Sequence, residues 1–288
     1  MKIAYTLLSS LLALAALTAH AQATTAATAA NTANTAGATT HMVTSHGHRV
    51  AFHVTPGKKP AIVLDAGGGL DSTHWSALVP ELAKRTGRQI ITYDRPGFGS
   101  SDEVPGPWSL QSATDDLEAG LTKLGATQGI ILVSHSIAGE IALTLANRHP
   151  QWLAGVVSVD ANVPEFFTDE VIEQMSAQYE PIIKAAKEGP STKESRQLLS
   201  VAASFAETNR AFHKATWPNR VPVIVIVSEK TPFEAPAPAQ WWRDAHAKFA
   251  KAGPNRRLLV AERSSHNVAI DRPDVIIQAV IDLAGGKP

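Results

Sequence analysis

The stretch Ile130-Ile131-Leu132-Val133-Ser134-His135-Ser136-Ile137-Ala138-Gly139 decides the fold of this chain. Its opening apolar run is typical of a buried strand, and the residues from 137 to 148 follow a helical pattern. Ser136 stands at the junction, with small residues two positions away on either side. A sharp turn from strand to helix needs such small neighbours, and it raises the serine hydroxyl above the sheet. The stretch therefore predicts a nucleophilic serine between a strand and a helix.

Outward from this turn, strand-like and helix-like runs alternate in both directions. The predicted strands are short and rich in β-branched residues, and they lie at 49–54, 61–65, 89–94, 129–133, 155–160, 221–227 and 257–260. The predicted helices lie at 75–85, 110–124, 137–148, 240–250 and 273–284. Such alternation predicts an α/β protein with a doubly wound, mostly parallel sheet. In such sheets the chemistry lies at the carboxyl ends of the strands.

One long stretch between two predicted strands carries no strand pattern. Its apolar residues recur at helical spacing, for example at Val171, Met175 and Tyr179, and Gly189-Pro190 interrupts the helices. An insertion of this size after a strand end is typical of a cover over a binding site. We therefore expect residues 161–220 to form a helical cap.

The N-terminal residues differ in composition from everything that follows. Lys2 precedes an apolar run at 3–17, and Ala19-His20-Ala21 follows it. This order is typical of a secretory signal peptide, and the run is shorter than a membrane span. We predict a signal peptide at 1–21, an Ala/Thr-rich disordered tether at 22–40 and a folded domain at 41–288. The mature protein is then secreted or periplasmic, with no membrane span.

Composition excludes several classes of function. The chain has 288 residues, with 26 basic and 26 acidic side chains and no cysteine. A net charge near zero gives no long-range attraction for nucleic acid, so we expect no such partner. Without cysteine there is no disulfide, thiolate metal site or cysteine nucleophile. His41, His46 and His48 lack metal-site spacing, and we expect neither a metal nor a cofactor.

Two further motifs accompany the serine turn in chain order. They are Asp94-Arg95-Pro96-Gly97-Phe98-Gly99-Ser100-Ser101-Asp102 and His266-Asn267-Val268-Ala269-Ile270-Asp271-Arg272-Pro273. With these motifs the chain resembles the α/β-hydrolase superfamily from about 41 to 283. The resemblance implies an eight-stranded sheet with a helical cap. The family usually has glycine on both sides of its serine turn, where this chain has Ser134 and Ala138.

The resemblance also implies a catalytic triad. His266 would be the general base that takes a proton from Ser136. The family usually carries its acid shortly after the seventh strand, where this chain has Thr231. Some members carry the acid at the end of the sixth strand, which corresponds to Asp160. Asp160 is therefore the expected acid, and Glu229 is the alternative.

An oxyanion hole and a substrate pocket complete the expected site. The backbone N–H of Ile137, directly after the serine, should donate to the oxyanion, and by family analogy the N–H of Gly68 is the second donor. The candidate pocket residues are large aromatic side chains of the cap and of the loop after the third strand: Trp75, Phe166, Phe167 and Trp217.

A serine at this turn excludes the alkyl-enzyme chemistry of the superfamily's dehalogenases and epoxide hydrolases, which need a carboxylate there. Acyl transfer to water remains. We expect a serine hydrolase that cleaves a small-molecule carboxylic ester or lactone through an acyl-serine. Two alternatives stay open at this point: a meta-cleavage type of C–C bond hydrolase, and a non-catalytic protein that binds a small ligand on the same fold.

Overall fold

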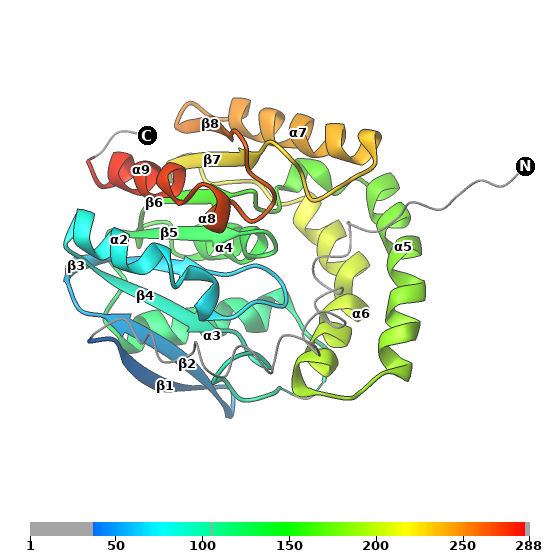
Figure 1. Ribbon diagram of the computed structural model, residues 1–288, viewed down its shortest axis with the longest axis horizontal. Coiled ribbons are helices and arrows are strands. Elements are labelled where there is room, and N and C mark those ends of the chain that lie inside the picture. Colours follow the sequence, from blue (N-terminus) through cyan, green and yellow to red (C-terminus); the bar gives the residue numbers. More distant parts are fainter. Residues whose placement is uncertain (1–36, 105, 286–288) are drawn as a thin grey trace, which may run out of the picture.

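The computed structural model describes residues 37–104 and 106–285, and its centre is a single eight-stranded sheet (Figure 1). The strands are β1 (Thr39–Ser45), β2 (His48–Thr55), β3 (Lys58–Asp65), β4 (Arg88–Asp94), β5 (Ile130–His135), β6 (Leu153–Val159), β7 (Val223–Ser228) and β8 (Arg256–Ala261). Their spatial order is β1-β2-β4-β3-β5-β6-β7-β8. β2 pairs antiparallel with both neighbours, and all other pairs from β4 to β8 are parallel. The predicted fold class is confirmed.

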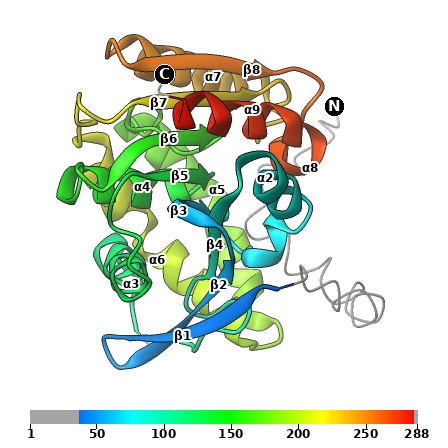
Figure 2. The same ribbon diagram turned by 90° about the vertical axis from the view of Figure 1, so that its left-hand side faces the viewer.

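Helices cover both faces of this sheet. Among the described residues, the helices outside the cap are α2 (Leu78–Thr86), α3 (Leu110–Lys123), α4 (Ala138–Arg148), α7 (Pro236–Lys251), α8 (Val268–Asp271) and α9 (Pro273–Ala284), with a short 3-10 helix η1 (Ser72–Trp75). Figure 2 shows α2 and α9 on one side of the twisted sheet and α3 and α4 on the other. Two buried apolar clusters follow from this arrangement, because successive strand residues point to opposite faces. Ile62 thus belongs to one cluster and Val63 to the other.

The predicted cap is a helical insertion between β6 and β7. It consists of η2 (Pro164–Phe166), α5 (Asp169–Glu188) and α6 (Lys193–His213), and Figure 1 shows α5 and α6 side by side at one end of the sheet. Each long helix begins at a threonine cap, since Thr168 accepts from the N–H of Val171 and Thr192 from that of Ser195. The insertion follows directly on β6, a strand of the central sheet.

The cap also docks on the turn that follows β4. Arg196 of α6 forms an ion pair with Glu103 at 2.6 Å, and the ammonium group of Lys193 donates to the carbonyl oxygen of Gly99 at 2.7 Å. Leu198 packs on Phe98 in a small apolar cluster. These contacts hold α6 over the carboxyl ends of the central strands.

Some element boundaries differ from those expected. β1 begins at Thr39, so two residues of the predicted tether belong to the sheet. The predicted helix at 75–85 is two elements, because η1 ends at Trp75 and α2 begins at Leu78. The predicted signal peptide lies outside the described residues. Within the part of the chain that the structure describes, no helix combines the length and hydrophobicity needed to cross a bilayer.

Candidate active site

The turn between β5 and α4 has the geometry expected from the sequence. Ser136 has a φ of +57°, a left-handed conformation that residues other than glycine rarely adopt. Ser134 and Ala138 are fully buried beside it. A Cβ atom on Gly139 would collide with the backbone oxygen of Asn162, so this position requires glycine. Larger residues at these positions would push the strand and the helix apart.

His266 and Asp160 meet although 106 residues separate them in the chain. Asp160 directly follows β6, His266 lies in the loop between β8 and α8, and the His266 Nδ1 atom is 2.7 Å from the Asp160 Oδ2 atom. Since a carboxylate is an acceptor, the imidazole donates its Nδ1–H to Asp160, which leaves Nε2 with a lone pair in the neutral ring.

The carboxylate of Asp160 is completely buried and fully hydrogen-bonded. Ser228 donates through its hydroxyl at 2.6 Å and its backbone N–H at 3.1 Å, and the indole of Trp242 donates at 2.8 Å. Burial alone would raise the pKa of Asp160, but the hydrogen bonds from His266 and Ser228 and the charge of nearby histidines bring it down to about 2. Asp160 is therefore charged at neutral pH.

Glu229, the alternative acid, does not occupy the position beside the His266 ring. It is exposed after β7, and its carboxylate accepts from the backbone N–H of Arg263 at 2.7 Å. Thr231, where the family usually has its acid, bonds through its hydroxyl to the backbone of Phe233. Of the two acids considered from the sequence, Asp160 is the one that contacts His266.

The loop after β3 forms part of the same site. Gly67, Gly68 and Gly69 line a cavity together with Ser136 and Ile137, so both expected oxyanion donors belong to this cavity. A Cβ atom on Gly67 would lie 2.7 Å from the ring of His135 and 3.3 Å from the side chain of Ser136. Only a glycine allows the loop to approach the serine this closely.

His135, the residue before the serine, contacts both His266 and His74. Its Nε2 atom is 3.0 Å from the carbonyl oxygen of His266, and its ring stacks on His74 at 4.9 Å between centroids. Burial, with the charge of His266 nearby, lowers the pKa of both rings, and that of His74 to about 4. Both are neutral at neutral pH. His135 thus holds the His266 loop.

The cavity above Ser136 has a volume of about 510 Å³. Phe166 and Phe167 line it, as expected, together with Met175, Tyr179 and Phe205 of the cap. Its walls are therefore largely aromatic and apolar.

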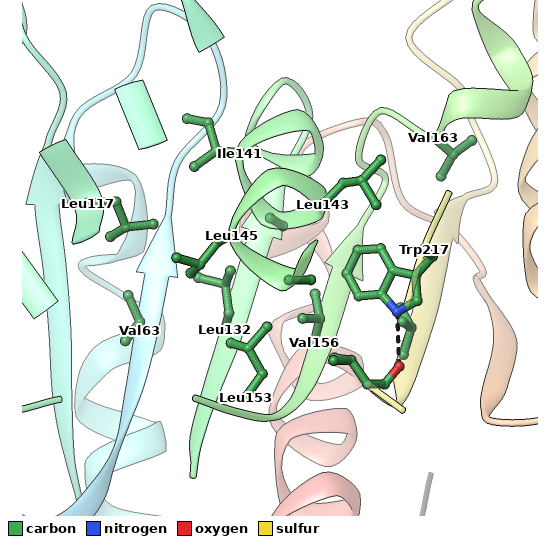
Figure 3. Packing of buried hydrophobic residues seen from close by; sticks show 14 of the residues in the cluster. Val63, Leu117, Leu132, Ile141, Leu143, Leu145, Leu153, Val156, Val163 and Trp217 are labelled. Carbon is green, nitrogen blue, oxygen red and sulfur yellow. Dashed lines mark hydrogen bonds between the residues drawn. The ribbon is translucent and has the colours of Figure 1, made fainter. Parts of the chain in front are cut away.

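Two predicted pocket residues are corrected by the structure, since neither Trp75 nor Trp217 is among the described residues that line the cavity. Trp75 is fully buried and packs edge-on against His74. Trp217 packs on Phe249, and its indole donates to the carbonyl oxygen of Val221 at 2.9 Å (Figure 3). Large aromatic side chains are buried wherever the core needs volume, so their size alone does not locate a pocket.

Several polar lining residues were not identified as site residues from the sequence, among them Arg95, Glu140 and Asn162. Glu140 is only 1% exposed and accepts a hydrogen bond from Asn162 at 2.6 Å. A glutamate inside the apolar run of α4 could have indicated it, because it lies one turn after Ser136. The described residues hold no group of three or more histidine or acidic side chains placed to bind a metal ion. His48 instead contacts Asp116 at 2.9 Å.

Comparison with known proteins identifies the family of this fold. The model of the Alpha/beta hydrolase family matches residues 62–279. The uncharacterized protein YqjL of Bacillus subtilis (strain 168) is 25% identical over 237 residues, which cover 81% of this chain and 88% of that protein. A pimeloyl-[acyl-carrier protein] methyl ester esterase of Sodalis glossinidius is 32% identical over 108 residues, 38% of each chain.

Among solved structures, a thermophilic esterase of Thermogutta terrifontis superposes with a TM-score of 0.58 at 20% identity, covering 87% of this chain and 99% of that one. At this identity the likeness concerns the fold. The family model, in contrast, spans most of the chain. The chain belongs to the alpha/beta hydrolase family.

Proposed function

We propose that this protein is a serine hydrolase that cleaves carboxylic esters or lactones, with Ser136 as nucleophile, His266 as general base and Asp160 as the acid. The observation that carries the proposal is the 2.7 Å contact between His266 Nδ1 and a buried carboxylate, in the cavity to which Ser136 belongs. A buried, charged acid holds the imidazole in the tautomer that can accept a proton at Nε2.

The reaction proceeds by two acyl transfers. The Ser136 Oγ atom attacks the carbonyl carbon, and its proton moves to the Nε2 atom of His266. The C–O bond of the ester then breaks, and the leaving alkoxide takes that proton and departs as an alcohol. Water attacks the acyl-serine, again giving its proton to His266, which returns it to Ser136 as the acid is released.

Two backbone donors would stabilise the negative charge that develops on the carbonyl oxygen. They are the N–H groups of Gly68 and Ile137, each of which would contribute about 3 kcal/mol to the transition state. Because Ile137 directly precedes α4, the positive end of that helix dipole adds to the stabilisation. A backbone N–H performs this role without any particular side chain.

Ester or lactone cleavage is favoured over the alternatives because esterases are among the relatives and the structural neighbours. Fluorophosphonate labelling tests the proposal without knowledge of the natural substrate. We expect the probe to add its mass at Ser136 of the folded protein, and His266→Ala to lose the labelling. An unlabelled but folded wild-type protein would overturn the proposal in favour of ligand binding.

We also propose that the chain is exported and that the signal peptide at 1–21 is removed. The proposal rests on Lys2, the apolar run at 3–17 and Ala19-His20-Ala21. N-terminal analysis of the protein from the periplasm or medium should give Gln22 as the first residue. An intact N-terminus in the cytoplasm would contradict it.

A further inference from the structure

The cavity contains polar side chains that Ser136, His266 and Asp160 do not use. Glu140, Gln197 and Asn209 all line it, and each is at most 4% exposed. The Gln197 Oε1 and Asn209 Oδ1 atoms are buried without a hydrogen-bond partner in the described part of the chain. Buried acceptors without partners are costly, which indicates that a bound molecule supplies donors.

Glu140 is the one of these three that is tied to the nucleophile. Asn162 donates through its backbone N–H to the carbonyl oxygen of Ser136 at 2.8 Å, and through its side chain to the Glu140 Oε1 atom at 2.6 Å. A single residue thus connects the carboxyl group to the serine. Ser136 and Glu140 thus line the same cavity from the start of one helix, and a ligand bound at Ser136 shares that cavity with Glu140.

The charges around the cavity exclude an anionic ligand. Arg95 is the only lysine or arginine among the described lining residues, and its guanidinium is bound to Asp65 and to the carbonyl oxygen of Ala66. Asp116 and Glu140 add carboxyl groups to the wall. A carboxylate or phosphate on the ligand would find no free cation there and would lose its hydration.

A hydroxyl group complements Glu140 better than a group that only donates. Burial raises the pKa of Glu140 to about 7, although the hydrogen bond from Asn162 and the charge of Arg95 act to lower it. The charge of Glu140 also acts on Tyr179. A carboxyl group offers an acceptor oxygen in either protonation state, and a donor O–H as well when it is protonated. A hydroxyl can pair with both, because it donates and accepts, whereas an amide N–H can use only the acceptor.

We propose that the cavity binds an uncharged ester or lactone with an alcoholic hydroxyl close to its carbonyl group, and that Glu140, held by Asn162, receives this hydroxyl. The inference rests on the proposed serine hydrolase function and narrows its substrate class. Glu140 is a specificity-determining residue in this scheme, and Ser136, His266 and Asp160 carry the bond cleavage.

The test compares three matched esters in a pH-stat assay. Ethyl hexanoate is the reference, ethyl 3-hydroxyhexanoate has its hydroxyl on the acyl side, and 2-hydroxyethyl hexanoate has it on the alcohol side. We expect kcat/KM for one hydroxylated ester to exceed that of the reference by about tenfold to a hundredfold. Which ester is preferred identifies the side of the substrate that faces Glu140.

Two variants assign that preference to a residue. Glu140→Met removes both polar oxygens at similar length, and the ratio of hydroxylated to plain ester should fall to about one. Glu173→Met makes the same change on an exposed residue of α5 that is not among the lining residues, and it should keep the wild-type ratio. Retention of the preference in Glu140→Met, with or without its loss in Gln197→Met, would overturn the assignment to Glu140.

The remaining outcomes separate this inference from the proposed function. Equal kcat/KM for all three esters, in a wild-type protein that a fluorophosphonate labels at Ser136, would overturn the inference and leave the hydrolase function intact. Neither labelling nor hydrolysis would overturn both. If Glu140→Met does not fold, Ser136→Ala decides: the preferred hydroxylated ester should raise its Tm more than ethyl hexanoate does, and an equal shift would contradict the inference.

Discussion

Arg95 donates a hydrogen bond to Asp65 at 2.7 Å, so a residue from the turn after β4 holds the end of β3. The same guanidinium donates to the carbonyl oxygens of Ala66 at 2.6 Å and of Gly67. The chain from Asp65 to Gly67 is thereby fixed directly before Gly68, the proposed oxyanion donor. Arg95 is 8% exposed, so water does not replace these contacts easily.

Arg95→Lys should therefore lower kcat by about a hundredfold, as expected when an oxyanion donor is displaced, with a smaller change in KM. Lysine keeps the positive charge, but its ammonium group lacks the planar guanidinium fork that binds Asp65, Ala66 and Gly67 at once. Steady-state kinetics on a small ester checks this, with urea unfolding as a control for the buried ion pair. A change confined to stability would mean that Arg95 only supports the fold.

Asp160→Asn should lower kcat by about a thousandfold to ten-thousandfold, because a neutral amide can hold His266 in the wrong tautomer. Glu229→Gln is the matched control, since it makes the same chemical change on an exposed acid after β7. Its kcat should stay within about twofold of the wild type. The opposite ranking of the two variants in an ester assay would reassign the acid.

Phe167→Leu should move the acyl-chain optimum towards longer chains, because Phe167 lines the cavity and a smaller side chain extends it. Trp217→Phe is the control within the core. It removes the hydrogen bond to Val221 and should cost about 1 kcal/mol of stability without changing the chain-length profile. Values of kcat/KM over a series of 4-nitrophenyl esters test both. An unchanged profile in Phe167→Leu would show that this residue only packs.

Glu140 gives the folded protein a specific pH dependence. Burial raises the pKa of its carboxyl group from an ordinary 4.5 to about 7, so the folded state binds the proton more tightly than the unfolded chain. The contribution of Glu140 to stability is thus most favourable below pH 4.5 and declines as the pH rises through 7.

Glu140→Gln cannot ionise and should escape this decline. Relative to the wild type, its free energy of unfolding should rise between pH 4.5 and pH 7 by up to about 3 kcal/mol and then level off. Urea unfolding at a series of pH values measures the difference. A difference that does not vary with pH would show that Glu140 is ionised throughout.

Much of the site follows from residues that are neighbours in the sequence. The turn around Ser136 could be predicted because its strand, its small residues and its helix are consecutive, and local pattern determines such a turn. The histidine loop likewise lies between a strand and a helix that follow one another. These parts of the site need no knowledge of contacts between distant segments.

Residues that act across the fold were harder to identify. Asp160 and Glu229 both follow strands, and only the meeting of the β6 end with the His266 loop distinguishes them. Trp217 was assigned to the pocket because of its size, yet size predicts burial and not location. Glu140 escaped notice because an acid in the first turn of a helix commonly serves only to balance the helix dipole.

The cap begins at the end of β6, directly after Asp160. The size of the pocket is thereby coupled to the position of the Asp160 carboxylate. Residues 160–167 include Asp160, the partner of Glu140, and two aromatic walls of the cavity. A change of backbone path that enlarges the pocket in this segment would also displace the carboxylate that orients His266. Variation in substrate size can instead arise on α6, for example at Phe205, whose backbone lies far along the chain from Asp160. Selection for new substrates should therefore accumulate insertions and deletions on α6 and leave the backbone of the 160–167 segment nearly constant.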